Sequence, residues 1–281
     1  MQLPILKNWP DYFENPHEGL GTTYERFVLN NHFKRIQSAF SIRNVLEVPS
    51  FGMTGISGIN SIWWATTGSQ VTVVDNNLKR LLSAKSVWST VALKADFVYL
   101  KDINRFEFKD KAFDLSWNFG SLWFIPDLNV FFQELTRVTR KVIFICVPNR
   151  SGLGHLTRLA INGGKNDSFF LDNLKKSVIL NGLKNQGWLL RETGYFDIPP
   201  WPDIAMKKEE LFKKIGLNRI IRLFKREKEG VDRRLCILDY LTGASPNMEK
   251  EIMRYSWLEN APWLIKKFWA HHRYFIFEKG K

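Results

Sequence analysis

The stretch VLEVPSFGMTGISGINS, residues 45–61, decides the fold of this chain. Its first four residues read as a strand, glycines three apart follow in a loop, and an apolar helix is predicted from Ser57 to Thr67. A second strand, Val71–Val74, follows and is capped by Asp75. A strand, a glycine-rich turn, a helix and a strand that ends in an acid are typical of a nucleotide-binding unit.

Strands and helices continue to alternate downstream. Further strands are predicted at 97–100, 112–117, 141–147 and 188–196, with helices after Asn77 and Pro126 and around 171–183. The strands at 71–74 and 141–147 are apolar throughout, as in a parallel sheet whose two faces are both covered by helices. The pattern therefore predicts an α/β fold with a doubly wound, mostly parallel sheet.

Polar residues and a glycine stand where these strands end. They are Glu47, Gly52, Asp75, Asp102 and Asn118. Right-handed crossovers bring the carboxyl ends of parallel strands to one edge of the sheet, and ligands bind in the crevice outside that edge. We therefore expect these residues to meet at a nucleotide site.

The ordered set of segments resembles the class I S-adenosylmethionine-dependent methyltransferases. The matching stretches are 45–48, 71–75, 102–103 with 112–115, 121–127, 147–150 and 271–275. The resemblance covers about residues 40–196 and the last ten residues. It implies a methyltransferase with S-adenosylmethionine as cofactor. It also implies a Rossmann-like, seven-stranded sheet with an antiparallel last strand, preceded by a helical segment and interrupted by a helical insertion.

The resemblance also implies roles for individual residues. Asp75 would accept hydrogen bonds from the ribose hydroxyls. The adenine amino group would meet Asp102, and Ile103 would offer a backbone N–H. The cofactor's ammonium would meet Glu47 or backbone oxygens such as that of Asn118. The full set of predicted cofactor-binding residues is Glu47, Pro49, Phe51, Gly52, Gly55, Asp75, Asn76, Asp102, Ile103 and Asn118.

The loop after the first strand departs from the family pattern. Pro49 and Phe51 stand where the family has small residues, and the loop is longer. Two interpretations remain open. In the first, the long loop arches over the cofactor and Gly52 and Gly55 contact it. In the second, the two bulky residues block the cofactor, and the chain is a binding protein that has kept the fold and lost catalysis.

Catalytic residues are less clearly marked. Methyl transfer from a sulfonium is an in-line displacement, so positioning supplies most of the rate and a base is needed only for a protonated acceptor. His17, His155 and Tyr24 are the candidates near the site, whereas His271 and His272 are expected to pack in the last strand. No Cys/His cluster has the spacing of metal ligands, so no metal site is predicted.

Composition limits the compartment and the partners. The formal net charge is +13, and the chain contains 11 Trp and 22 Phe. Cys146 and Cys236 cannot form a disulfide framework, which favours a reducing compartment. Neither a signal peptide nor a membrane-spanning run is recognised. These features predict a cytoplasmic protein that at most lies on the inner face of a membrane.

The expected organisation has four parts. They are an aromatic, helical lid segment at 1–41, the cofactor-binding domain at 42–198, a basic, Trp-rich insertion at 199–268 and a final strand at 269–281. Residues 207–228 hold nine basic and three acidic side chains, with apolar residues at helical spacing. Such a helix either packs as a lid or lies on an anionic membrane.

Composition also bears on the methyl acceptor. The aromatic content favours a small apolar or amphiphilic molecule, such as a quinone, an isoprenoid or a lipid precursor. An RNA-modifying methyltransferase is the alternative, supported by charge alone, because no nucleic-acid-binding module is recognised. The oligomeric state is not specified by the sequence.

Overall fold

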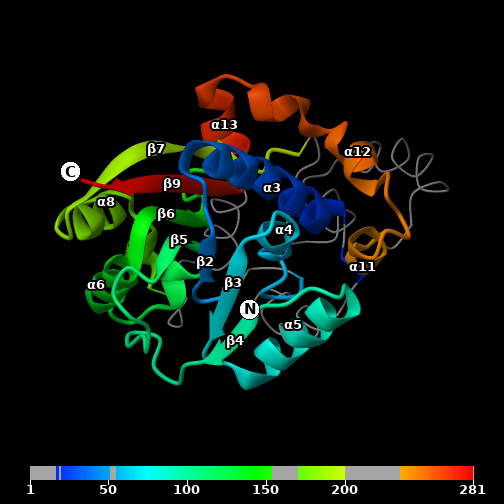
Figure 1. Ribbon diagram of the computed structural model, residues 1–281. Helices are drawn as coiled ribbons and strands as arrows, with labels where there is room; N and C mark the ends of the chain where they lie inside the picture. Colours follow the sequence, from blue (N-terminus) through cyan, green and yellow to red (C-terminus); the bar gives the residue numbers. More distant parts are fainter. Residues whose placement is uncertain (1–16, 19, 51–54, 154–169, 200–234, 281) are drawn as a thin grey trace, which may run out of the picture.

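The chain folds around a seven-stranded sheet of order β4-β3-β2-β5-β6-β9-β7 (Figure 1). The structure is a computed structural model that describes residues 17–18, 20–50, 55–153, 170–199 and 235–280. The strands are β2 (Asn44–Glu47), β3 (Gln70–Asp75), β4 (Asp96–Tyr99), β5 (Phe113–Phe119), β6 (Thr139–Pro148), β7 (Trp188–Phe196) and β9 (His272–Lys279). β9 runs opposite to the other six strands and pairs antiparallel with both β6 and β7. The predicted Rossmann-like sheet with an antiparallel last strand is confirmed.

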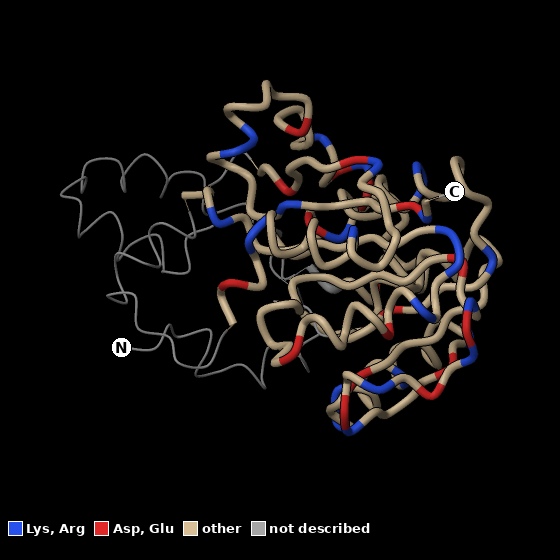
Figure 2. The backbone as a smooth tube through the Cα atoms, turned by 90° about the vertical axis from the view of Figure 1, so that its left-hand side faces the viewer, with Lys and Arg blue, Asp and Glu red and all other residues tan. Residues whose placement is uncertain are grey.

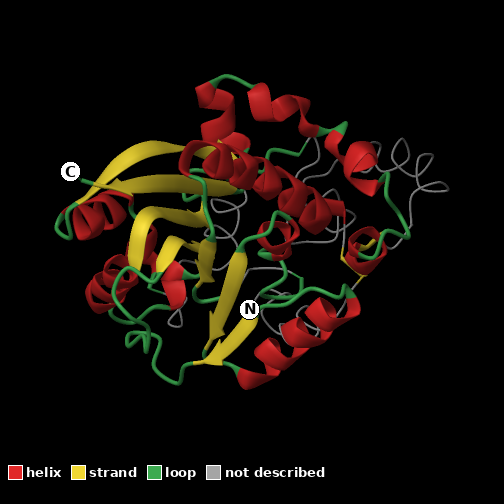
Figure 3. Cartoon of the chain, in the orientation of Figure 1, coloured by secondary structure: helices red, strands yellow, loops and turns green. Residues whose placement is uncertain are grey.

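Helices cover both faces of this sheet (Figure 3). They are α3 (Leu20–Phe40), α4 (Ile62–Thr66), α5 (Leu78–Thr90), α6 (Leu128–Val138) and α8 (Lys176–Lys184), with 3-10 turns η1 (Leu122–Phe124) and η2 (Leu171–Leu174). Val45 and Val73 join a core with α3, α4 and α5, whereas Leu46 and Val74 join a second core with α6 and α8. Because side chains alternate along each strand, both faces are buried, as the apolar strands predicted.

The helix expected after the first strand is shorter than predicted. It was expected from Ser57 to Thr67, but α4 covers only Ile62–Thr66, and residues 55–61 form turns. Gly58 has a φ of +72°, which a right-handed helix does not contain. The left-handed backbone at Gly58 therefore delays the start of the helix.

Gly58 also allows a close approach between segments. A Cβ atom built on it would lie 2.9 Å from Val73 Cγ1 and 3.2 Å from Ala84 Cβ. We expect Gly58→Ala to lower the free energy of unfolding by about 2–4 kcal/mol, from left-handed strain and overpacking together. Gly68→Ala is the matched control, because Gly68 has a φ of +87° and nothing within 4 Å of its added Cβ. Urea denaturation of both variants checks this, and equal losses would contradict the packing argument.

The N-terminal helix α3 crosses one face of the sheet. Thr22 and Thr23, which could cap a helix by residue type, lie inside it because the helix begins at Leu20. The two-residue strand β1 (His17–Glu18) pairs antiparallel with β8 (Leu235–Cys236) and so ties the two chain segments together. Phe33 on α3 is fully buried against Trp117 of β5, with ring centroids 4.9 Å apart.

The described part of the predicted insertion is helical. It contains α11 (Ile237–Leu241), α12 (Met248–Met253), the 3-10 turn η3 (Ser256–Asn260) and α13 (Trp263–Trp269). On α12, Glu249 forms an ion pair with Lys34 of α3. The predicted basic helix at 207–228 lies outside the described residues.

Basic and acidic residues are both spread along the described backbone (Figure 2). Among the described helices, none combines the length and the apolar character that crossing a membrane requires. Cys146 is buried and free, as expected, while the side chain of Cys236 lies outside the described residues.

Candidate active site

The carboxyl ends of β2, β3 and β5 meet at one edge, as the sequence predicted. Glu47, the last residue of β2, stands opposite Val73 of β3 on one side and Trp117 of β5 on the other. Asp75 and Asn118 follow these partners by one or two positions. Two acidic side chains and one amide, each from a different strand, therefore lie at the same edge of the sheet.

Glu47 is buried at this edge. Its side chain is 2% exposed, and its Oε2 has no hydrogen-bond partner. Burial raises the pKa of Glu47 to about 8, against the opposing effects of a hydrogen bond with Ser61 and the charge of Arg26. A carboxyl group held this way has a vacant polar atom next to the predicted cofactor.

Asn118 is a second group of the same kind. It is fully buried, and neither its amide nitrogen nor its amide oxygen has a partner. The hydroxyls of Ser57 and Ser121, which follow the ends of β2 and β5, are also buried without partners. Unpaired buried polar groups cost about 1–3 kcal/mol each, so a cluster of them indicates a polar ligand or water.

Asp75, by contrast, has all its hydrogen bonds made. Its Oδ1 accepts from Arg80 Nη2 at 2.6 Å and from the backbone N–H of Asn77 at 2.8 Å. Its Oδ2 accepts from Ser50 Oγ at 2.8 Å and from Arg80 Nε at 3.1 Å. Asp75 is fully buried, whereas the Arg80 side chain is 18% exposed. Ribose hydroxyls can therefore reach this carboxylate only if Arg80 moves aside.

The other predicted cofactor residues differ from one another in exposure and in hydrogen bonding. Asn76 is exposed, and its Oδ1 accepts from Arg80 Nη2 at 3.2 Å. Asp102 is exposed and accepts the backbone N–H of Asn104, while Ile103 is buried in the core. Pro49 is buried after a cis peptide bond, and Gly55 has a φ of +71°. Phe51 and Gly52 lie outside the described residues, so their predicted roles stay predictions.

The catalytic candidates are only partly placed. Tyr24 on α3 is fully buried and donates a hydrogen bond to Glu259 Oε1 at 2.9 Å. Burial and the charge of Glu259 raise the pKa of Tyr24 well above its usual range, so this tyrosine stays protonated. His17 lies in β1 without a described side chain, and His155 lies outside the described residues.

Sequence reasoning missed a polar cluster beside this edge. His271 and His272 were expected only to pack, but each meets a carboxylate. His271 Nδ1 lies 2.8 Å from Asp197 Oδ2, and His272 Nε2 lies 2.9 Å from Glu25 Oε2. The signal available in the sequence was the pair of adjacent histidines at the start of a strand. Their carboxylate partners lie far away in the chain, so spacing could not reveal them.

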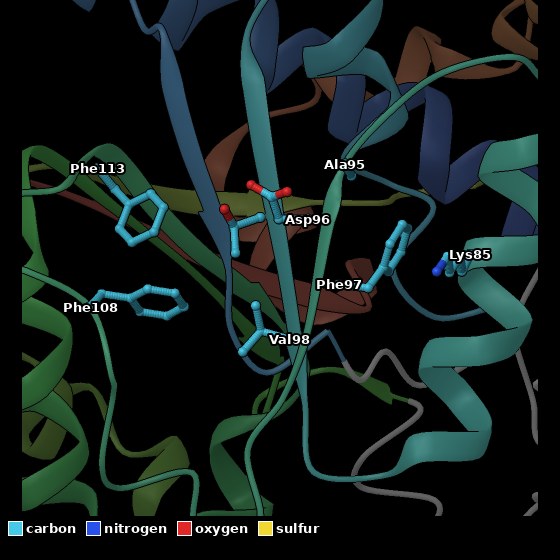
Figure 4. Close-up of a pocket in the computed structure, with 8 residues that line it drawn as sticks. Lys85, Ala95, Asp96, Phe97, Val98, Phe108 and Phe113 are labelled. Carbon is cyan, nitrogen blue, oxygen red and sulfur yellow. The ribbon is translucent and has the colours of Figure 1, made fainter.

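A pocket of about 570 Å³ lies away from this site. Thr72, Asp96, Phe108 and Phe113 are among its lining residues, and Asp96 is the first residue of β4 (Figure 4). It is therefore near the amino end of the edge strand. The pocket has no polar group in common with the residues expected to bind the cofactor.

A sheet of this strand order is also the fold of class I S-adenosylmethionine-dependent methyltransferases. The family model described as "Methyltransferase domain" matches residues 52–145. The match covers about a third of the chain and supports a methyltransferase that uses S-adenosylmethionine. None of the curated proteins matches it.

Solved structures agree on the fold. An S-adenosylmethionine-dependent methyltransferase from Clostridium acetobutylicum has a TM-score of 0.51 at 10% identity, covering 92% of each chain. A Galdieria sulphuraria protein assigned as a sarcosine dimethylglycine methyltransferase has a TM-score of 0.52 at 12% identity, covering 92% of this chain and 86% of its own. A Bacillus halodurans protein assigned as a methyltransferase has a TM-score of 0.52 at 13% identity, covering 89% of this chain and 100% of its own. These identities establish similarity of fold alone.

The residues present fit the amino-acid half of this cofactor. Glu47 and Asn118 offer a carboxyl and an amide with vacant buried atoms, which suit an ammonium and a carboxylate. Asp75 fits the ribose half only after it exchanges Arg80 for hydroxyl groups. Arg80 is therefore the one described residue that must be displaced in this interpretation.

Proposed function

We propose that this methyltransferase acts on a small apolar or amphiphilic acceptor. This proposal is supported by aromatic side chains that lie near Asn118 at the carboxyl edge of the sheet. Phe119 follows Asn118 and lies 6.2 Å, centroid to centroid, from Phe196 at the end of β7. His272 packs on both rings. All three rings are buried, and an aromatic wall of this kind suits an apolar or amphiphilic acceptor.

The single observation that carries the proposed function is the vacant polar pair Glu47 and Asn118. Both side chains are almost fully buried, and both lie at the ends of central strands. When bound, S-adenosylmethionine supplies a methyl group on a sulfonium, with a good leaving group. The chain's own part is to hold the cofactor's amino-acid end, to exclude water and to align the acceptor in line with the methyl carbon.

Asn118→Leu tests this assignment. Leucine has the same branched shape and number of heavy atoms, and it removes two unpaired polar atoms, so we expect the free energy of unfolding to rise by about 1–3 kcal/mol. Binding of S-adenosylmethionine should weaken by about tenfold or more, because one good hydrogen bond is lost and a polar ligand group then faces a methyl. Urea denaturation and calorimetry with the cofactor measure the two effects on the same sample.

Leu122→Met is the control for this experiment. Leu122 is fully buried near the same edge, and a volume-conserving exchange there should leave cofactor affinity unchanged. If Asn118→Leu destabilised the protein and left binding intact, Asn118 would be a structural residue. If the unaltered protein bound no cofactor, the binding protein that has lost catalysis would become the better interpretation.

A membrane surface is a second proposed partner, and α13 supports it. Trp263, Leu264 and Phe268 are 58%, 61% and 49% exposed on this short helix, which also carries Lys266 and Lys267. Exposed Trp and Leu beside Lys suit the headgroup region of an anionic bilayer. Figure 1 places α13 at the outside of the molecule, beyond β7 and β9.

Vesicle flotation tests this partner. We expect the protein to float with phosphatidylcholine vesicles that contain phosphatidylserine, and much less with phosphatidylcholine alone. Leu264→Ser should reduce flotation severalfold, whereas Leu82→Ser, which removes a leucine 57% exposed on α5, should not. Flotation that ignores both lipid charge and Leu264→Ser would reject the membrane proposal.

A further inference from the structure

Three side chains from distant parts of the chain meet beside the carboxyl edge of the sheet. Glu25 comes from the first turns of α3, Asp197 follows β7, and His272 begins β9. Their side chains are 12%, 3% and 4% exposed. Figure 1 shows α3 passing over the start of β9. No metal site was predicted from sequence spacing, but the fold assembles one carboxylate, a second carboxylate and an imidazole.

The separations between the donor atoms suit a shared ion. His272 Nε2 lies 2.9 Å from Glu25 Oε2 and 3.7 Å from Asp197 Oδ2, and one ligand atom from each residue lies within 4.8 Å of the others. Two ligands that each stand about 2.0–2.2 Å from a metal ion, at angles between square and tetrahedral, are about 2.9–3.6 Å apart. The 2.9 Å separation lies in this range, and the 3.7 Å separation lies just above it, so little movement would bring both to the distances of shared ligands.

One vacant atom at this place points to a ligand independently. Asp197 Oδ1 is buried and has no hydrogen-bond partner. A carboxylate with an unpaired oxygen, 97% buried, is costly unless something binds it. Its other oxygen is held by His271 Nδ1 at 2.8 Å, which fixes the orientation of the carboxylate.

The charges point the same way. The side chains of Glu25 and Asp197 are 12% and 3% exposed, and both approach His272. Carboxyl groups gathered out of water in this way are balanced by protons or by a cation.

The backbone at Asp197 is also unusual. Its φ is +62°, a left-handed conformation that aspartate tolerates better than most residues. Backbone strain of this kind persists where the surroundings hold it in place, and it is concentrated at functional sites. Here it turns the chain directly after β7, so that the carboxylate faces β9.

We propose that Glu25, Asp197 and His272 bind one divalent transition-metal ion of the Zn²⁺ or Mn²⁺ type. An imidazole with two carboxylates is a donor set that these ions accept, and two carboxylates neutralise the ion's charge. His272 stands opposite Pro148 at the end of β6, and its ring lies 4.6 Å from Phe119. A part for the ion in methyl transfer would rest on the function proposed above, but its binding does not.

Calorimetry with metal salts tests the proposal on the full chain without a polyhistidine tag. The protein is treated with EDTA, freed of it, and titrated with ZnCl₂ and separately with MnCl₂, in the absence of cofactor. We expect one ion per chain for at least one of the two metals. Asp197→Asn and His272→Gln should each weaken binding at least tenfold. Asparagine tolerates the left-handed backbone, so the first variant should keep its fold.

Glu278→Gln is the matched control, because Glu278 lies on the same strand in an exposed ion pair with Arg191. It should bind metal like the unaltered protein. Glu25→Gln replaces any variant that loses the wild-type circular dichroism spectrum. The proposal fails if neither metal binds, or if metal binding survives in Asp197→Asn and His272→Gln, which would indicate adventitious surface binding. Since no cofactor is present, failure here is separate from failure of S-adenosylmethionine binding.

Discussion

Asp75→Asn is expected to weaken binding of S-adenosylmethionine by about 100-fold or more. Each hydrogen bond from a ribose hydroxyl to a charged acceptor is worth about 1.5–3 kcal/mol, and the variant loses the charge and one acceptor. The carboxylate lies at the carboxyl end of β3, next to the vacant groups of β2 and β5. Calorimetry with the cofactor or its demethylated product measures the loss.

Replacing Arg80 gives a second test of the same ribose site. This side chain donates to both oxygens of Asp75, so it competes with any hydroxyl that binds there. Arg80→Met keeps most of the side-chain length and removes the competing charge. We expect it to raise cofactor affinity by about threefold to tenfold, and to lower the stability of the cofactor-free protein because the buried carboxylate loses its partner.

Controls separate these effects from general damage. Asp172→Asn removes an exposed carboxylate that pairs only locally with Lys175, so neither affinity nor stability should change. Circular dichroism must show that Asp75→Asn keeps the native spectrum. Unchanged affinity in a folded Asp75→Asn protein would mean that the ribose lies elsewhere, and unchanged affinity in Arg80→Met would mean that Arg80 does not occupy the ribose position.

The sheet could be predicted because its signal is local. The apolar runs at 71–74 and 141–147, and the helix starts after Asn77 and Pro126, are each read within a few residues. The structure has the runs as strands, and it begins helices at Leu78 and Leu128. The meeting of Glu47, Asp75 and Asn118 also follows from parallel topology alone. The site's details depend instead on conformations that no local pattern encodes.

Two examples show the difference. Arg80 follows Asp75 closely in the sequence, yet its ion pair with the carboxylate depends on the rotamers of both side chains. Glu25 and His272 are separated by nearly the whole chain and meet only because α3 crosses the start of β9. Spacing rules for metal ligands recognise residues that are close in sequence, so they could not find this cluster.

Glu47 should make the stability of the protein depend on pH over an unusual range. Its pKa is raised from 4.5 to about 8 in the folded state, first of all by burial. Below pH 4.5 the folded and unfolded chains both carry the proton, so no stability is lost. As the pH rises toward 8, the unfolded chain ionises while the folded chain keeps its proton. The free energy of unfolding should therefore fall by up to about 1.4 kcal/mol per pH unit.

Glu47→Gln isolates this contribution. Glutamine has nearly the same shape and does not titrate, so the difference between the two proteins should grow from pH 5 to pH 8 and then level off. The full difference is on the order of 5 kcal/mol. Urea denaturation at a series of pH values measures it, and other titrating groups cancel in the comparison. Parallel pH profiles would mean that Glu47 is ionised in the folded protein, with a cation or donor already at its vacant oxygen.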